Sequence, residues 1–137
     1  MSTEIDFDEL RHLARQAMTR AYAPYSGFPV GAAGMSESGH IALGGNVENV
    51  SYGLGVCAEV SMVANALGAG ARRLRAVSVC DGDGRVLTPC GRCRQVLLEF
   101  GGEGLLVDGE HGPRALVELL PDAFGPQHLQ RRSGEAR

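Results

Sequence analysis

The chain has 137 residues, 44% of them hydrophobic and 21% charged, which is typical of one globular domain that folds without disulfides. No segment approaches the roughly 20 apolar residues of a membrane span. The acidic start lacks the basic and apolar segments of a secretory signal. We therefore expect a cytoplasmic protein with no membrane partner, in which cysteines bind metal or carry out redox chemistry rather than form disulfides.

The charge balance argues against a nucleic-acid partner. The chain carries 13 basic and 16 acidic residues, a net charge of -3, and the basic clusters are confined to residues 72–75 and 131–132. Nucleic-acid binding proteins usually present a net basic face. We therefore expect a small-molecule ligand and no nucleic acid.

The first half of the chain predicts a helix followed by a hairpin. Asp6 and Glu9 have the spacing of a capping box, and apolar residues then recur at helical spacing over residues 7–21. The helix should end before Pro24, because the residue preceding a proline avoids helical geometry. Two short apolar runs at 29–35 and 41–46 flank a Glu-Ser-Gly turn and predict two antiparallel strands.

The second half predicts helices alternating with strands. Residues 56–71 favour a second helix, residues 75–80 a buried strand, and Pro89 opens a third helix that ends near Gly101. Residues 105–107 and 115–117 indicate two more strands, although the second is equally compatible with a helix. This alternation predicts a sheet covered by helices. We expect one domain over residues 1–129 and a disordered tail over 130–137.

Two predicted helix starts carry the residues most suited to chemistry. Cys57 and Glu59 lie at the start of the second helix, and Cys90 and Cys93 at the start of the third. Helix N-termini stabilise anions and favour thiolates. Three protein ligands with an open fourth position are typical of catalytic zinc, whereas four ligands are typical of structural zinc. Glu59 is placed to act on a metal-bound water as general base, although a lone carboxylate there is usually a surface residue.

Other readings of these residues remain open. Cys80 as a fourth ligand would give a closed structural site, but a cysteine in an apolar strand usually packs in the core. A thioredoxin-like redox pair would leave Cys57 and Glu59 without a role. Three thiolates around Zn²⁺ carry a net negative charge. Arg92 and Arg94 are available to offset it, unless they are solvated helix-end residues.

The sequences Cys-Ala-Glu at 57–59 and Pro-Cys-Gly-Arg-Cys-Arg-Gln at 89–95 resemble those of the small, homo-oligomeric, zinc-dependent cytidine deaminases. The resemblance runs from Tyr22 to Leu129 and includes residues 23–26, 28–33, 46–49, 51–53 and 119–124. It implies an α/β protein with a three-layer α/β/α fold and a mixed five-stranded sheet. It also implies one zinc ion per chain, held by Cys57, Cys90 and Cys93.

The same resemblance implies the mechanism and the substrate contacts. Glu59 would take a proton from water and pass it to N3 of the pyrimidine, hydroxide would add at C4, and ammonia would leave. The implied substrate-binding residues are Phe28 beside the base, Asn46 and Glu48 at the ribose, Tyr52, Ala58, and Phe124 from another subunit of a homotetramer. From the residues alone, 46–49 is equally well described as a polar turn.

One position departs from the family pattern. Many members have arginine directly after the catalytic glutamate, where this chain has Val60; Arg92 is then a candidate for the missing charge.

The function implied by the resemblance is deamination of free cytidine or 2′-deoxycytidine in pyrimidine salvage. The alternatives are a deaminase of a modified cytosine nucleoside, such as an antibiotic, and a structural zinc module.

Overall fold

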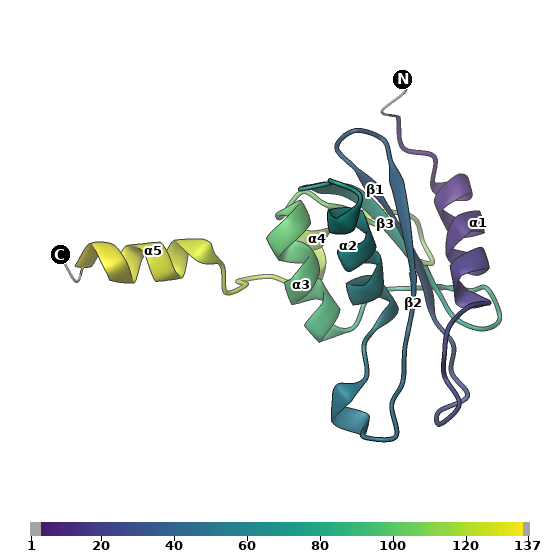
Figure 1. Ribbon diagram of the computed structural model, residues 1–137. Helices are drawn as coiled ribbons and strands as arrows, with labels where there is room; N and C mark the ends of the chain where they lie inside the picture. The colour runs from purple at the N-terminus through teal and green to yellow at the C-terminus, as the bar shows by residue number, and fades with distance from the viewer. Residues whose placement is uncertain (1–3, 136–137) are drawn as a thin grey trace.

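The computed structural model describes residues 4–135, in which one sheet lies between two helical layers (Figure 1). The strands are short, the longest being β3. The elements in chain order are α1 (Phe7–Met18), β1 (Gly31–Ser36), β2 (Ile41–Gly45), the 3₁₀ turn η1 (Tyr52–Leu54), α2 (Ala58–Gly68), β3 (Leu74–Cys80), β4 (Val86–Leu87), α3 (Gly91–Gly101), β5 (Leu106–Val107), β6 (Arg114–Ala115), α4 (Leu116–Leu119) and α5 (Pro126–Glu135).

The sheet is mixed, which confirms the predicted α/β class. Its order is β2-β1-β3-β5-β6, with β4 paired to β3 beside this path. Strands β3 and β5 are parallel, and every other pair is antiparallel. The expected number of five strands was wrong, because residues 4–135 form a sheet of six. A strand of two residues such as β4 is too short to leave an alternating pattern in the sequence.

Helix α1 covers one face of the sheet. Asp6 caps it by accepting a hydrogen bond from the Glu9 amide at 3.2 Å, as predicted, and the helix ends at Met18 rather than at residue 21. Its buried side chains pack against one face of β1 and β3, including Cys80. The side chain of Cys80 therefore belongs to the α1 layer.

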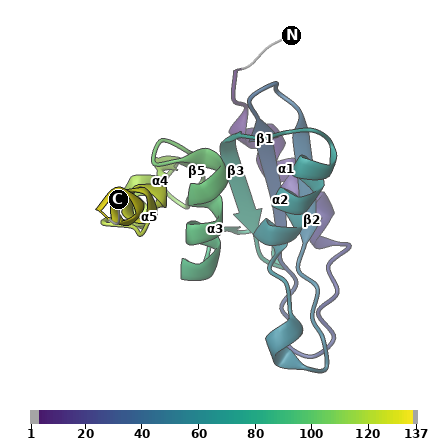
Figure 2. The same cartoon turned by 60° about the vertical axis from the view of Figure 1, so that its left-hand side comes forward.

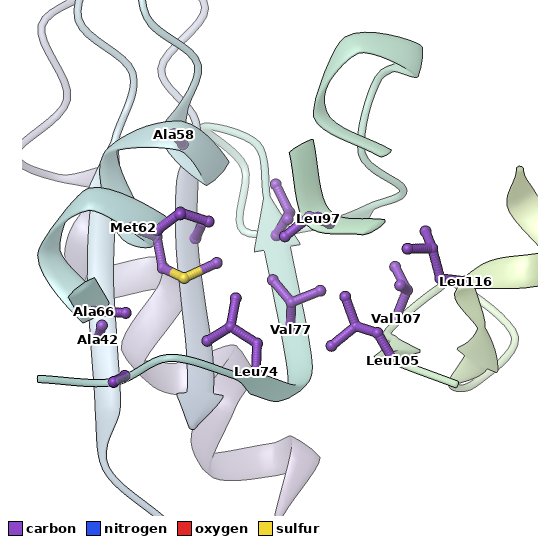
Figure 3. Close-up of a cluster of buried hydrophobic side chains, with 14 residues drawn as sticks. Ala42, Ala58, Met62, Ala66, Leu74, Val77, Leu97, Leu105, Val107 and Leu116 are labelled. Carbon is purple, nitrogen blue, oxygen red and sulfur yellow. The ribbon is translucent and has the colours of Figure 1, made fainter. Parts of the chain in front are cut away.

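Helices α2 and α3 cover the opposite face, where the larger core lies (Figure 3). Met62 of α2, Leu97 of α3 and Val77 of β3 are all fully buried there. Helix α2 approaches β2 so closely that a Cβ on Gly44 would overlap the α2 backbone at Ala58 and Met62. This contact fixes the N-terminal turn of α2, which begins directly after Cys57.

The C-terminal part differs from the prediction in two places. Only residues 114–115 form a strand, and the chain continues into α4 at Leu116. Helix α5 reaches Glu135 and extends away from the other elements (Figure 1), so the tail expected to be disordered is helical through that residue; residues 136–137 lie outside the described range. Pro126 at the first helical position favours this start. No helix of the described residues is long and apolar enough to span a membrane.

Candidate active site

The two helix starts bring three thiols together. Cys57 and Cys90 are the N-cap residues of α2 and α3, and Cys93 lies in the first turn of α3. Their Sγ atoms all lie within 4.8 Å of one another. Tetrahedral zinc with Zn–S bonds of about 2.3 Å places its sulfur ligands about 3.8 Å apart. The spacing therefore fits a shared zinc ion after a small inward movement of the side chains.

The three thiols have shifted pKa values. Burial, followed by the neighbouring Glu59 carboxylate, raises the pKa of Cys93, and burial raises the pKa of Cys57. Burial acts in the same direction on Cys90, but hydrogen bonds involving Cys93 and Cys57 outweigh it and lower its pKa. A divalent cation deprotonates coordinating thiols. Such a cation would offset the charge that three neighbouring thiolates would otherwise concentrate.

Cys80 lies on the other side of the sheet. Among the described residues the cluster consists of Cys57, Cys90 and Cys93, while Cys80 is 2% exposed and packs in the α1 layer. The protein therefore supplies three sulfur donors at this place. This is the ligand number of catalytic zinc sites, and the alternative of a closed four-cysteine site is not supported.

Glu59 is buried beside the thiols. It lies in the first turn of α2, is 4% exposed, and lines a pocket of about 250 Å³ together with Cys57 and Cys90. Burial raises its pKa, although its own backbone amide and the Cys93 thiol act in the opposite direction. A carboxyl group with a raised pKa can both accept and release a proton near neutrality. The surface-carboxylate reading of Glu59 therefore does not hold.

The same pocket contains three of the predicted substrate-binding residues, Phe28, Asn46 and Ala58. Asn46 accepts a hydrogen bond from the Val30 amide at 2.8 Å and donates one to the Phe28 carbonyl at 3.1 Å. Asn46 therefore shapes the pocket by holding the segment that carries Phe28. Sequence reasoning missed Val79, Leu87 and Thr88, which also line the pocket.

A wider pocket of about 510 Å³ adjoins the first, because Asn46 and Cys57 line both. Glu48 and Tyr52, two of the predicted substrate-binding residues, line this wider pocket. The Glu48 carboxylate accepts hydrogen bonds from the Tyr25 and Ser26 amides at 3.0 Å and from the Ser26 hydroxyl. The bonds from Ser26 lower the pKa of Glu48, which keeps this carboxylate ionised.

Phe124 is placed apart from both pockets. It is 59% exposed, and its ring stacks on His128 with centroids 5.2 Å apart. Phe124 is not among the residues lining either pocket. Phe124 is thus the one predicted substrate-binding residue that lines neither pocket in a single chain.

The two arginines beside the cysteines have different surroundings. The Arg94 guanidinium donates to the carbonyl oxygens of Pro89 and Leu119, both at 2.7 Å. Arg92 is exposed and lines the wider pocket together with Cys57. Arg94 is therefore engaged by backbone oxygens, whereas Arg92 lines a pocket that Cys57 also lines.

Three sulfur donors beside a buried carboxylic acid and an adjoining pocket are the parts of a hydrolytic zinc enzyme. The family model of the cytidine and deoxycytidylate deaminase zinc-binding region matches residues 6–107, and the chain belongs to this family. One Zn²⁺ per chain fits the Cys57, Cys90 and Cys93 cluster.

Proteins of similar sequence and structure match this chain along nearly its whole length. A cytidine deaminase of Mycobacterium tuberculosis is 53% identical over 128 residues, which are 93% of this chain and 96% of that protein. A crystal structure of cytidine deaminase from M. tuberculosis superposes with a TM-score of 0.87 at 54% identity, covering 89% of this chain and 99% of the other. The cytidine deaminase structure from M. leprae gives a TM-score of 0.85 at 46% identity, covering 87% and 100%.

Proposed function

We propose that this chain deaminates free cytidine and 2′-deoxycytidine to uridine and 2′-deoxyuridine, with release of ammonia, in cytoplasmic pyrimidine salvage. The observation that carries the proposal is the pocket that Glu59 shares with the metal-binding thiols. A buried carboxylic acid beside three sulfur donors suits hydrolysis at an amidine carbon, where protons must move to and from the substrate.

Bound zinc supplies a Lewis acid that makes water a nucleophile near neutral pH. The proton transfers of the reaction are carried out by Glu59. Glu59 accepts a proton from water and delivers it to N3 of the pyrimidine, and hydroxide forms the new bond at C4. Glu59 then takes the proton of the C4 hydroxyl and passes it to the amino group, the C4–N bond breaks, and ammonia leaves as the C4 carbonyl of uridine forms. Because Glu59 is nearly fully buried, these protons stay within the pocket.

The substrate residues divide between the two pockets. Phe28 and Ala58 line the smaller pocket with Glu59, where the base must lie for its C4 to meet the nucleophile. Glu48 and Tyr52 line the wider pocket, where the sugar attached to the base would lie. A site that hydrogen-bonds a sugar discriminates strongly against a ligand without one, because its polar groups lose their partners.

A substrate panel tests this proposal. Zinc-loaded protein should release ammonia from cytidine and deoxycytidine, with loss of cytosine absorbance, and should react poorly with cytosine, CMP and adenosine. Turnover of a bulky cytosine nucleoside alone would favour a deaminase of modified nucleosides. Bound zinc without ammonia release from any nucleoside would favour a structural module.

We further propose that the active form is a homotetramer with shared sites. Several large apolar side chains are exposed on the loops beside the pockets, among them Tyr22, Tyr25, Phe28, Val47, Tyr52 and Leu54. The 22–28 loop and the η1 loop extend side by side from the same end of the sheet (Figures 1 and 2), and the rings of Tyr25 and Tyr52 are 6.4 Å apart. Exposed patches of this kind usually mark contact surfaces.

Mixing two damaged chains tests the shared site. In the proposal, Glu59 of one chain works with Phe124 of a neighbour, so a Glu59→Gln chain still offers Phe124 and a Phe124→Ala chain still offers Glu59. Measured at a substrate concentration too low for either variant alone, activity should reappear after subunit exchange. No recovery, with exchange demonstrated by mass spectrometry of differently labelled chains, would rule the shared site out.

A further inference from the structure

Two residues directly after Cys93 reach the segment that carries Phe124. Arg94 donates to the Leu119 carbonyl at 2.7 Å, and the Gln95 side-chain amide donates to the Phe124 carbonyl at 2.8 Å. Leu119 and Phe124 are the two ends of the segment 119–124. The N-terminal half of α3 therefore holds this segment at both ends.

Arg94 also holds the loop before the first cysteine of α3. Its Nε donates to the Pro89 carbonyl at 2.7 Å, and its Nη2 lies 3.4 Å from the Thr88 hydroxyl. Pro89 directly precedes Cys90. One guanidinium group thus joins the backbone next to a metal-binding cysteine to the start of the segment 119–124.

The ring of Phe124 is fixed as well, although it is exposed. It stacks on the His128 imidazole with an interplanar angle of 12°, and the Gly125 amide donates to His128 Nδ1 at 3.0 Å. An exposed aromatic ring held at its backbone and on one face is preorganised for a partner, because little freedom remains to be lost on contact.

We propose that Arg94 and Gln95 are positioning residues that set where Phe124 stands, and so tie nucleoside binding in a neighbouring chain to the helix that carries Cys93. The inference rests on the proposed shared site. It gives a role to two residues of the Cys-Arg-Gln sequence at 93–95 that neither hold the metal nor line the substrate pockets.

Gln95→Met tests the proposal with little change in side-chain size, because methionine keeps the length of glutamine but lacks the donor. The variant should raise KM for cytidine about fivefold, the effect of one neutral hydrogen bond, with kcat and zinc content unchanged. Glu99→Met, an exposed position on the same helix, is the matched control and should change neither constant. An unchanged KM in Gln95→Met would overturn the proposal.

A double-mutant cycle separates positioning from general stabilisation. If Gln95 acts through the Phe124 ring, adding Gln95→Met to Phe124→Ala should raise KM no further. Independent, multiplying effects would overturn the proposal. Hydrogen exchange of the amides of residues 119–125 supplies a readout besides activity, and it should quicken in Gln95→Met while exchange in β3 stays unchanged.

Arg94 requires a conservative pair of variants, because it supports two segments at once. Arg94→Met should raise KM and quicken exchange in the segment 119–124, and Arg94→Lys should restore part of both.

If Phe124→Ala leaves KM unchanged, the shared site fails and this inference fails with it. If Phe124→Ala raises KM while Gln95→Met does not, the positioning role alone is refuted.

Discussion

The sulfur atoms of Cys57 and Cys93 lie within 4.8 Å of each other, although the first caps α2 and the second lies in the first turn of α3. The two helices are brought together by packing on the same face of the sheet. The metal-binding cluster is therefore a product of the α2/α3 layer, and it should be sensitive to loss of any one thiol.

The first prediction concerns these ligands. Cys57→Ser and Cys93→Ser should each lose zinc, measured as metal per chain after dialysis, because a catalytic zinc site keeps three protein ligands. Cys80→Ala is the control and should retain one zinc per chain, since Cys80 packs in the α1 layer. Zinc lost from Cys80→Ala but kept in Cys57→Ser would show that the ligand set is wrong.

The second prediction concerns Arg92. It lies in the first turn of α3, where a cation opposes the helix dipole at a cost of about 0.3–1 kcal/mol. We expect Arg92→Gln to lower kcat about three- to tenfold with zinc retained, because the thiolates lose a nearby positive charge. Arg20→Gln, an exposed arginine away from the active site, should leave kcat unchanged. A full kcat in Arg92→Gln would place the compensating charge elsewhere.

How much of this site follows from sequence depends on the residue. Cys57, Glu59, Cys90 and Cys93 could be predicted together, because capping positions and short spacings are local features that place anions at helix starts. The burial of Glu59 depends on β3, β4 and the start of α3, whose residues line the same pocket, and no local pattern contains this arrangement. The position of Phe28 beside the base stays a prediction that rests on the resemblance, and the structure shows that Phe28 lines the pocket of Glu59.

The elements of the fold that have a local sequence pattern were also predictable, and the long-range pairings were not. Helices α1, α2 and α3, the β1–β2 hairpin and β3 could be predicted from periodicity and turn residues. The parallel pairing of β3 with β5 could not, since β5 has two residues and pairing depends on contacts distant in sequence. The hydrogen bond from Gln95 to the Phe124 carbonyl is of the same kind. It joins residues 29 positions apart that show no shared pattern.

The third prediction concerns stability. Arg11 donates to both oxygens of the fully buried Asp108 carboxylate, at 2.7 and 2.8 Å, which also accepts from the Ser78 hydroxyl at 2.7 Å. Arg11→Met should lower the free energy of unfolding by about 2–4 kcal/mol, because a buried carboxylate loses its charged partner. Urea unfolding at saturating zinc measures the change.

The same arginine provides its own control. Arg11 also contacts Asp8 at 3.3 Å, but the Asp8 side chain is 93% exposed. Asp8→Ala should therefore change the free energy of unfolding by less than about 1 kcal/mol. Equal losses in the two variants would mean that the Asp108 contact contributes no more than a surface ion pair.

The fourth prediction concerns Glu48. A carboxylate offers about four acceptor sites, and the 25–26 loop uses three of them. A sugar hydroxyl therefore finds one acceptor free, and Glu48→Ala should raise KM for cytidine more than Ser26→Ala does. Steady-state kinetics compare the two variants. Equal changes would indicate that Glu48 serves only to hold the loop.

The role of Glu59 is the central claim. Glu59→Gln keeps the size of the side chain but cannot carry a proton, so it should retain zinc and fold while losing more than about 10³-fold in turnover. Ammonia release from cytidine by zinc-loaded Glu59→Gln and unmodified protein, measured side by side, tests this most directly. The account predicts release by the unmodified protein and near-zero release by the variant at equal zinc content. Comparable release by the two proteins would contradict it.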